Sequence, residues 1–160
     1  SYNDVVDNPY PDWEMYESPS KFCWQLLTSD AVVPLRSTEG SAGFDLQSIA
    51  EMTIPAKHRN WVPTGVALEI PKGLVGFVWP RSGLAGKGID TSAGVIDSDY
   101  RGEIRVLLVN NSDSDFTINK GNRIAQLIIV ETLSPGVNFT VVDCLSSTER
   151  GTNGFGSTGT

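Results

Sequence analysis

The sequence predicts a single all-β domain of the sandwich or barrel type, and three observations support this prediction. Short runs rich in β-branched and aromatic residues recur about every 10 residues, and Gly, Pro, Asn and Asp separate them. No stretch of about a dozen residues has the apolar spacing of a helix. The chain of 160 residues is long enough for one domain with a core and short for two.

Nine stretches have the composition of strands. We expect strands at 21–27, 43–48, 52–56, 64–71, 73–80, 102–111, 115–118, 122–131 and 138–144. Two stretches, Arg105–Val109 and Ile124–Val130, are nearly continuous apolar runs, which indicates strands covered on both faces. In a chain of this size, another subunit can cover the second face of these strands.

Residues 1–20 form an N-terminal extension with three prolines and no clean periodicity. We expect a mobile or surface-lying arm. Tyr10, Trp13, Met15 and Tyr16 leave open the alternative that the extension anchors to a neighbouring subunit or a partner.

The remaining chain divides in two. Residues 21–145 are the expected β domain, and residues 146–160 form a hydrophilic, glycine-rich tail whose one aromatic residue is Phe155. A tail of that composition is normally disordered unless a ligand holds it.

The formal net charge of −7 argues against binding to a nucleic-acid polymer, and no stripe of Lys or Arg offsets it. A small phosphorylated ligand remains compatible, because local donors and a divalent cation outweigh net charge inside a cleft.

Several features predict an intracellular protein, in the cytoplasm or nucleus or associated with a virus. No apolar run approaches the roughly 20 residues that span a bilayer, so we expect no membrane association. No basic start precedes an apolar stretch, as it would in a secretory signal. Cys23 and Cys144 lack metal-site spacing, and we expect two buried thiols in a reducing compartment.

Five segments differ from ordinary turns. They are AGFDL (42–46), PRSGLAGKG (80–88), GVIDSDYRGEI (94–104), GNRIAQLI (121–128) and RGTNGFGSTG (150–159). In this order and at these spacings they resemble the five motifs of the trimeric dUTPase family, over roughly residues 24–159. The resemblance implies a jelly-roll-like β-clip fold, a homotrimer with shared active sites, and Mg²⁺-dependent hydrolysis of dUTP to dUMP and pyrophosphate.

Arg81, Ser82 and Gly83 combine a guanidinium, a hydroxyl and exposed backbone N–H groups, which makes them candidate phosphate donors. The alternative is an ordinary bend with a surface arginine. The resemblance places the inner phosphates here and adds Gln126 as a donor. Without the resemblance, Gln126 is better explained as a strand residue that satisfies a backbone group.

The chain has no GxxxxGK[ST] motif, so it is not a P-loop protein. The resemblance assigns to Asp45 the carboxylate that orients Mg²⁺ through water. The alternative is an aspartate at a turn or a strand end. Magnesium keeps several waters, so one carboxylate and three phosphates make a sufficient site.

The segment 94–104 is expected to form a hairpin with a polar turn. By resemblance, main-chain groups near Gly94 and Arg105 read uracil, and Tyr100 packs under the deoxyribose and excludes a 2′-hydroxyl. Asp97 resembles the general base that activates water for in-line attack on the α-phosphorus. Asp99 has the same chemistry but stands at a position that is structural in the family.

The tail residues Arg150, Phe155, Gly156, Ser157 and Thr158 match the family's flexible clamp. The resemblance implies that Phe155 stacks on uracil, while Arg150, Ser157 and Thr158 close on the outer phosphates and exclude water.

Two departures from the family pattern stand out. The segment 81–94 is one residue shorter than the common cellular form, a feature that some retroviral members share, so the source stays open. Asn153 stands where glycine is frequent, and Asn tolerates left-handed geometry.

Competing functional classes fit the sequence less well. His58, the only histidine, lies in a polar turn and is expected to be solvated. A dCTP deaminase would need a different carboxylate and an amide-reading pocket. An inactive dUTPase-like interaction protein would not need to retain all five segments, and a generic β-sandwich binding module does not explain the tail.

Overall fold

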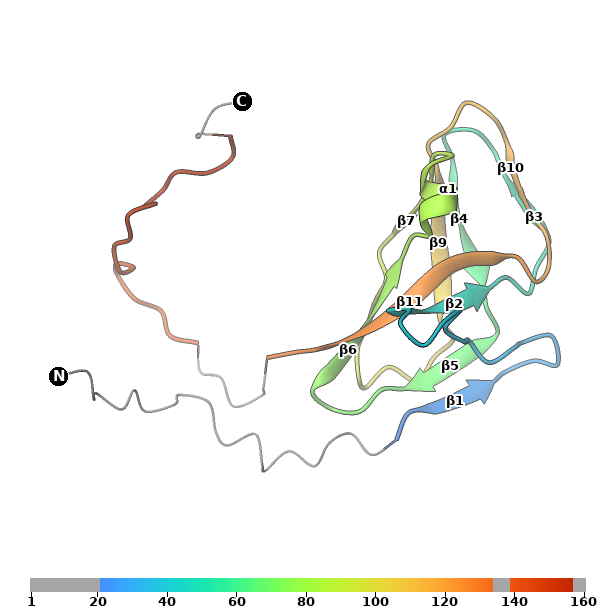
Figure 1. Ribbon diagram of the computed structural model, residues 1–160, viewed down its shortest axis with the longest axis horizontal. Helices are drawn as coiled ribbons and strands as arrows, with labels where there is room; N and C mark the ends of the chain where they lie inside the picture. The colour runs from blue at the N-terminus through green and yellow to red at the C-terminus, as the bar shows by residue number, and fades with distance from the viewer. Residues whose placement is uncertain (1–20, 134–138, 157–160) are drawn as a thin grey trace.

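The computed structural model describes residues 21–133 and 139–156. Within these ranges the chain forms eleven strands and one short helical turn, which confirms the all-β class (Figure 1). No helix in the described ranges has both the length and the apolar character to cross a membrane. The N-terminal extension, 1–20, and the tail residues Ser157 and Thr158 lie outside the described residues.

Eight of the nine expected strands are present, and three more, β4, β7 and β8, lie outside the nine expected stretches. In chain order the elements are β1 (Cys23–Leu26), β2 (Gly43–Gln47), β3 (Met52–Ile54), β4 (Arg59–Pro63), β5 (Val66–Glu69), β6 (Leu74–Trp79), α1 (Ser82–Ala85), β7 (Ile89–Ser92), β8 (Val95–Ile96), β9 (Arg105–Asn110), β10 (Phe116–Ile118) and β11 (Arg123–Glu131). The sequences of β4 and β7, RNWVP and IDTS, are too polar to resemble strands, and pairing with β9 holds both extended.

The expected strand at 138–144 is the exception, because its described residues, 139–144, contain no strand. A strand needs a hydrogen-bonded neighbour. In Figure 1 this stretch runs clear of the sheets, so it has no strand partner among residues 21–133 and 139–156.

The strands pair antiparallel in four sheets. Their orders are β1-β5, β10-β3, β2-β11-β6-β8 and β4-β9-β7. The two larger sheets supply most of the sandwich, and β11 is the longest strand, paired with β2 on one side and β6 on the other.

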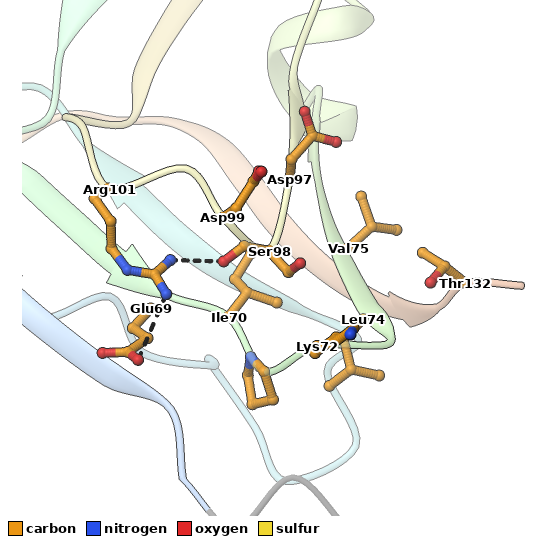
Figure 2. A pocket seen from close by; sticks show the side chains of 11 residues that line it. Glu69, Ile70, Lys72, Leu74, Val75, Asp97, Ser98, Asp99, Arg101 and Thr132 are labelled. Atoms are coloured by element: carbon orange, nitrogen blue, oxygen red, sulfur yellow. Dashed lines mark hydrogen bonds and ion pairs between the residues drawn. The ribbon is translucent and has the colours of Figure 1, made fainter. Parts of the chain in front are cut away.

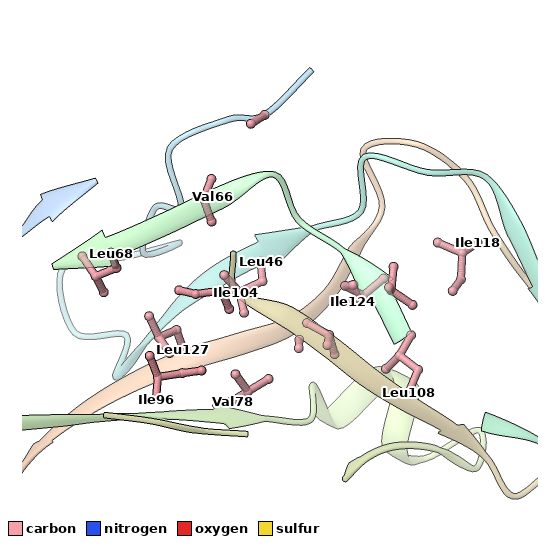
Figure 3. Packing of buried hydrophobic residues seen from close by; sticks show 14 of the residues in the cluster. Leu46, Val66, Leu68, Val78, Ile96, Ile104, Leu108, Ile118, Ile124 and Leu127 are labelled. Atoms are coloured by element: carbon pink, nitrogen blue, oxygen red, sulfur yellow. The ribbon is translucent and has the colours of Figure 1, made fainter. Parts of the chain in front are cut away.

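One hydrophobic core lies between the sheets (Figure 3). Its most deeply buried side chains include Leu46, Ile54, Ile104, Leu108 and Leu127. Each fully buried Leu or Ile contributes about 1.5–3 kcal/mol of transfer free energy, so this core can hold the sheets in fixed positions.

The expectation of a hairpin at 94–104 is wrong. β8 pairs with β6, whereas β9 pairs with β4 and β7, so the two arms belong to different sheets. The segment 97–104 is therefore a connection between sheets, and we call it the sheet-crossing loop. Apolar residues on either side of a polar turn fit both arrangements, which is why the pattern misled.

The expectation of buried cysteines is also wrong. Cys23 and Cys144 are both exposed free thiols. Cys23 points outward from β1, and Cys144 lies in the stretch that runs clear of the sheets.

Candidate active site

A pocket of about 230 Å³ lies where β8 leads into the sheet-crossing loop. Its lining comprises Trp61, Ala93, Gly94, Val95, Ile96, Asp97, Tyr100, Glu103 and Arg105. Four of the predicted site residues, Gly94, Asp97, Tyr100 and Arg105, thus share one hollow, which we call the β8–β9 pocket.

The pocket opens at the end of a strand ladder. β7 and β9 pair from Ile89–Asn110 to Ser92–Leu107, and the same register would place Gly94 opposite Arg105. The ladder ends before that point because Ala93 and Gly94 have φ of 61° and 111° and turn the chain away. The Gly94 carbonyl instead accepts the N–H of Val78 (2.8 Å).

Gly94 has no room for a side chain. A Cβ here would lie 2.8 Å from Cβ of Val78 and 3.0 Å from its carbonyl oxygen, besides the strained φ. The ladder therefore ends at the β8–β9 pocket, which Gly94 and Arg105 both line.

Asp97 and Asp99 differ in what they face. Asp97 lines the β8–β9 pocket, but Asp99 does not. Both line a larger groove of about 780 Å³ on the other side of the loop, where Arg101 pairs with Glu69 (3.5 Å). Figure 2 shows the Asp97 carboxylate turned away from that ion pair. The larger groove lacks Gly94, Tyr100 and Arg105, so the smaller pocket is the better candidate for the site.

Tyr100 is held at the mouth of the pocket. Its hydroxyl donates to the carbonyl of Glu103 (2.8 Å), and its own N–H donates to the carbonyl of Asp97 (3.1 Å). The loop between Asp97 and Glu103 therefore has a defined conformation that fixes the ring.

Sequence reasoning missed two residues of the pocket wall. The guanidinium of Arg105 lies 5.5 Å from the ring centre of Trp61, a cation–π contact between β9 and β4. Arg105 was expected to act through its main chain. The contact shows that its side chain lies against the Trp61 ring. Trp61 belongs to no distinctive motif, so no sequence signal indicated it. Glu103 lies within the segment 94–104, but no role was assigned to it.

A second group of predicted residues gathers around Asp45 on β2. The Asp45 carboxylate lies 3.2 Å from Nε of Arg81 and 3.5 Å from Nη1 of Arg123, and it accepts the hydroxyl of Ser37 (2.9 Å). Ser82 follows Arg81 as the first residue of α1, with Gly83 after it. We call these residues the Asp45 cluster.

Gln126 joins the same cluster from β11, where it pairs with Asp45 in the strand register. Its Nε2 donates to the carbonyl of Pro80 (3.0 Å), directly before Arg81. Gln126 therefore does what strand chemistry alone predicted, because it satisfies a backbone group, and in doing so it fixes the turn that carries Arg81 and Ser82.

The structure does not bring all predicted residues together in one chain. The β8–β9 pocket has no lining residue from the Asp45 cluster. The described tail, which includes Arg150, Phe155 and Gly156, runs clear of the sheets (Figure 1). Phe155 is fully exposed at a φ of 50°.

The tail nevertheless has local structure around Arg150. Nε of Arg150 donates to the carbonyl of Asn153 (2.9 Å), and the N–H of Asn153 donates to the carbonyl of Arg150 (3.2 Å). The sequence predicted that the tail has no structure of its own. The turn at Arg150–Asn153 differs from that prediction. As expected, His58 lies in an exposed turn, where Nδ1 contacts the carbonyl of Ala56.

The family model for dUTPase matches residues 29–159 of this chain. The chain belongs to the dUTPase family. It is 49% identical over 134 residues to the deoxyuridine 5′-triphosphate nucleotidohydrolase of Paramecium bursaria Chlorella virus 1, covering 83% of this chain and 94% of that protein.

Solved dUTPase structures have the same fold. The dUTPase of Staphylococcus bacteriophage 80alpha with dUpNHpp superposes with a TM-score of 0.81 at 29% identity, covering 88% of this chain and 99% of that one. A mutant dUTPase from phage phi11 of S. aureus, which coordinates a structural Mg(II) ion, has a TM-score of 0.73 at 25% identity, over 79% and 99% of the chains. These comparisons confirm the predicted family and fold.

Proposed function

We propose that this chain hydrolyses dUTP to dUMP and pyrophosphate, with Asp97 as the general base. The observation that carries the proposal is the β8–β9 pocket, which joins a carboxylate, an aromatic ring and an open end of main chain in one hollow. Family membership and relatives named for this activity support the same substrate.

Uracil is the proposed occupant of the open ladder end. Its edge alternates acceptor, donor and acceptor, which main-chain groups at Gly94 and Arg105 can pair as a strand would. Cytosine presents a different pattern and would leave buried polar groups unpaired, so it is rejected. The Tyr100 ring packs against the deoxyribose and leaves no room for a 2′-hydroxyl.

Asp97 follows Ile96 directly and so lies close to the α-phosphate of a nucleotide whose base is at Gly94. Its carboxylate accepts a proton from water as the oxygen attacks the α-phosphorus in line, and pyrophosphate leaves. Neither Asp97 nor Asp99 has an ion pair among the described residues, so position decides between them, and only Asp97 lines the pocket.

The Asp45 cluster is the proposed phosphate-binding group. Arg81, Ser82, Gly83 and Gln126 supply charged and neutral donors. Because the β8–β9 pocket of the same chain lies apart from this cluster, we propose that one site combines the pocket of one subunit with the cluster of another.

A trimer would supply that arrangement and would cover exposed apolar surface. On the outer face of the β2-β11-β6-β8 sheet, Phe77 pairs with Val95, and Trp79 pairs with Gln126. Trp79 is 55% exposed and Val95 61%, an unusual surface for an isolated chain. We propose that this face packs against neighbouring subunits in a homotrimer.

The tail is the proposed lid. We assign residues 21–145 to the β domain and 146–160 to an arm that closes over a site built by other subunits. Phe155 stacks on the base, and Arg150, Gly156, Ser157 and Thr158 enclose the phosphates. Closure excludes water and aligns the attacking groups.

Magnesium fits the Asp45 cluster only as a partly hydrated ion. No group of three or more His, Cys, Asp or Glu within the described residues could hold a metal, and two arginines already contact Asp45. Asp45 would orient the ion through water, while substrate phosphates supply the other ligands. Bound Mg²⁺ neutralises triphosphate charge.

We also propose that the protein acts inside the cell. Cys23 and Cys144 are exposed free thiols, and thiols stay reduced in intracellular compartments.

The test measures pyrophosphate release from dUTP and, in parallel reactions, from dCTP, UTP and dTTP. We expect release from dUTP alone at comparable substrate concentrations. Ammonia release from dCTP would establish a deaminase instead, and no turnover of any of the four would establish an inactive relative.

A further inference from the structure

The ring of Tyr100 lies across Gly102. A Cβ on Gly102 would stand 2.5 Å from the Tyr100 hydroxyl oxygen, 2.7 Å from Cζ and 3.0 Å from Cε2. Real Cβ atoms do not approach other atoms this closely, so the observed ring position requires glycine at 102.

Backbone conformation does not explain this glycine. Gly102 is not among the residues with positive φ, unlike Gly94. Alanine is therefore compatible with the main chain at 102, and the conflict concerns only the far end of one side chain. That side chain is 42% exposed and has space to move, so the fold can survive the substitution while the ring leaves its position.

Glu103 fixes the acceptor that holds the ring. Its carbonyl accepts the Tyr100 hydroxyl (2.8 Å), while its side-chain Oε2 accepts the N–H of Gly65 (3.1 Å) in the turn before β5. The next residue, Ile104, is buried and donates its N–H to Val66 (2.8 Å). The main chain at 103 is thereby attached to the turn between β4 and β5.

We infer that Gly102 and Glu103 are positioning residues that set the selectivity of the site against ribonucleotides. This inference rests on the proposed function, in which Tyr100 excludes the 2′-hydroxyl. One oxygen atom separates UTP from dUTP, so a ring displaced by a methyl group gives the space that the hydroxyl needs. Gly102 keeps the ring close to the sugar, and Glu103 prevents the acceptor from following the ring.

The main test compares Gly102→Ala with Gly40→Ala in the full chain. A Cβ at Gly40 would meet no atom within 4 Å, and Gly40 has no positive φ, so it is a matched control outside the site. The measurement is kcat/KM for dUTP and for UTP. Gly102→Ala should reduce the dUTP/UTP ratio about tenfold, mainly through better use of UTP, with the thermal midpoint unchanged. Gly40→Ala should keep the wild-type ratio.

Glu103 is tested by a conservative pair. Glu103→Gln retains an oxygen acceptor for the Gly65 N–H and should keep the ratio, whereas Glu103→Ala should lower it. Tyr100→Phe, which removes the donor to the Glu103 carbonyl, should lower it as well.

Tyr100→Ala separates the two possible failures. If Tyr100→Ala leaves the dUTP/UTP ratio unchanged, the proposed role of the tyrosine is wrong. If Tyr100→Ala lowers the ratio but Gly102→Ala and Glu103→Ala do not, the tyrosine acts without these neighbours and the positioning inference is overturned.

Discussion

The carboxylate of Asp45 lies 3.2 Å from Nε of Arg81, and this ion pair joins two sequence segments that are 36 positions apart. Arg81 also donates through Nη1 to the carbonyl of Arg123 (3.3 Å). Because Asp45 is only 17% exposed, it holds the guanidinium in one orientation. Asp45 thus orients Arg81, the proposed phosphate donor, in addition to its proposed role toward magnesium.

Asp45→Asn should therefore affect both substrate and metal. We expect KM for dUTP to rise about tenfold, because the amide no longer attracts Arg81, and the Mg²⁺ concentration for half-maximal activity to rise with it. Asp113→Asn, at an exposed ion pair with Lys57, is the control and should change neither. If KM stayed normal while the Mg²⁺ requirement changed, Asp45 would not orient Arg81 for substrate binding.

Asp97→Asn tests the proposed role of Asp97 as general base. The amide keeps the shape but accepts no proton, so kcat should fall about 100-fold or more with KM largely retained. Asp99→Asn should leave kcat close to wild type, because Asp99 faces only the larger groove. Equal losses in the two variants would mean that lining the β8–β9 pocket does not distinguish them.

Chelation separates catalysis from folding. With EDTA, activity should fall to background, while circular dichroism and the thermal midpoint stay near their starting values, because Asp45 alone cannot hold a structural metal. Added Mg²⁺ should restore activity. Unfolding on chelation at moderate temperature would show that the metal is part of the fold.

Mixed trimers test whether the tail closes over another subunit's site. Two inactive variants are refolded together: Asp97→Asn with its tail, and a chain cut after Glu149 with Asp97 intact. If the tail acts in trans, random mixing at equal amounts should restore roughly a quarter of the sites, since two independent choices are each right half the time.

Mixing must be verified by mass or by pull-down of a tag on one variant. Verified mixed trimers without recovered activity would show that the tail serves its own subunit.

Asn110 should be a major contributor to stability. It is fully buried on β9, where Nδ2 donates to the carbonyls of Ile54 (3.0 Å) and Ser114 (2.8 Å) and Oδ1 accepts from Ser112. Asn110→Leu leaves these groups unpaired and should lower the free energy of unfolding by about 3 kcal/mol.

The adjacent, exposed Asn111 provides the control for this substitution. Asn111→Leu should change the free energy of unfolding by less than about 0.5 kcal/mol in urea titrations at one protein concentration. Similar losses at both positions would show that the buried hydrogen bonds of Asn110 are not the cause.

The strands that sequence could predict are those rich in apolar, β-branched or aromatic residues, such as β2 and β9. β4 and β7 could not be predicted, because Arg59, Asn60 and Asp90 become extended only through pairing with β9. The residue pattern of a segment indicates only its own preference for the extended conformation. A strand that is stabilised mainly by pairing with its neighbours has little preference of that kind.

The site shows the same division. Gly94, Asp97 and Tyr100 were indicated by one segment and do share a pocket. Trp61 reaches that pocket from 36 positions before Asp97, and only the register of β4 against β9 brings it there. The separation of the Asp45 cluster from the pocket could not be predicted either, because spacing along the chain does not say which motifs line the same hollow.

The open end of the β7–β9 ladder also limits how the enzyme's selectivity can change. With the base paired to main-chain atoms, as proposed, the atoms that choose uracil are present whichever side chains stand nearby. Gly94 accepts no other residue beside Val78, whereas the Arg105 side chain points to Trp61. Single substitutions can loosen or block such a pocket, but they cannot exchange a donor for an acceptor. A change of preferred base would therefore require the backbone itself to be rebuilt.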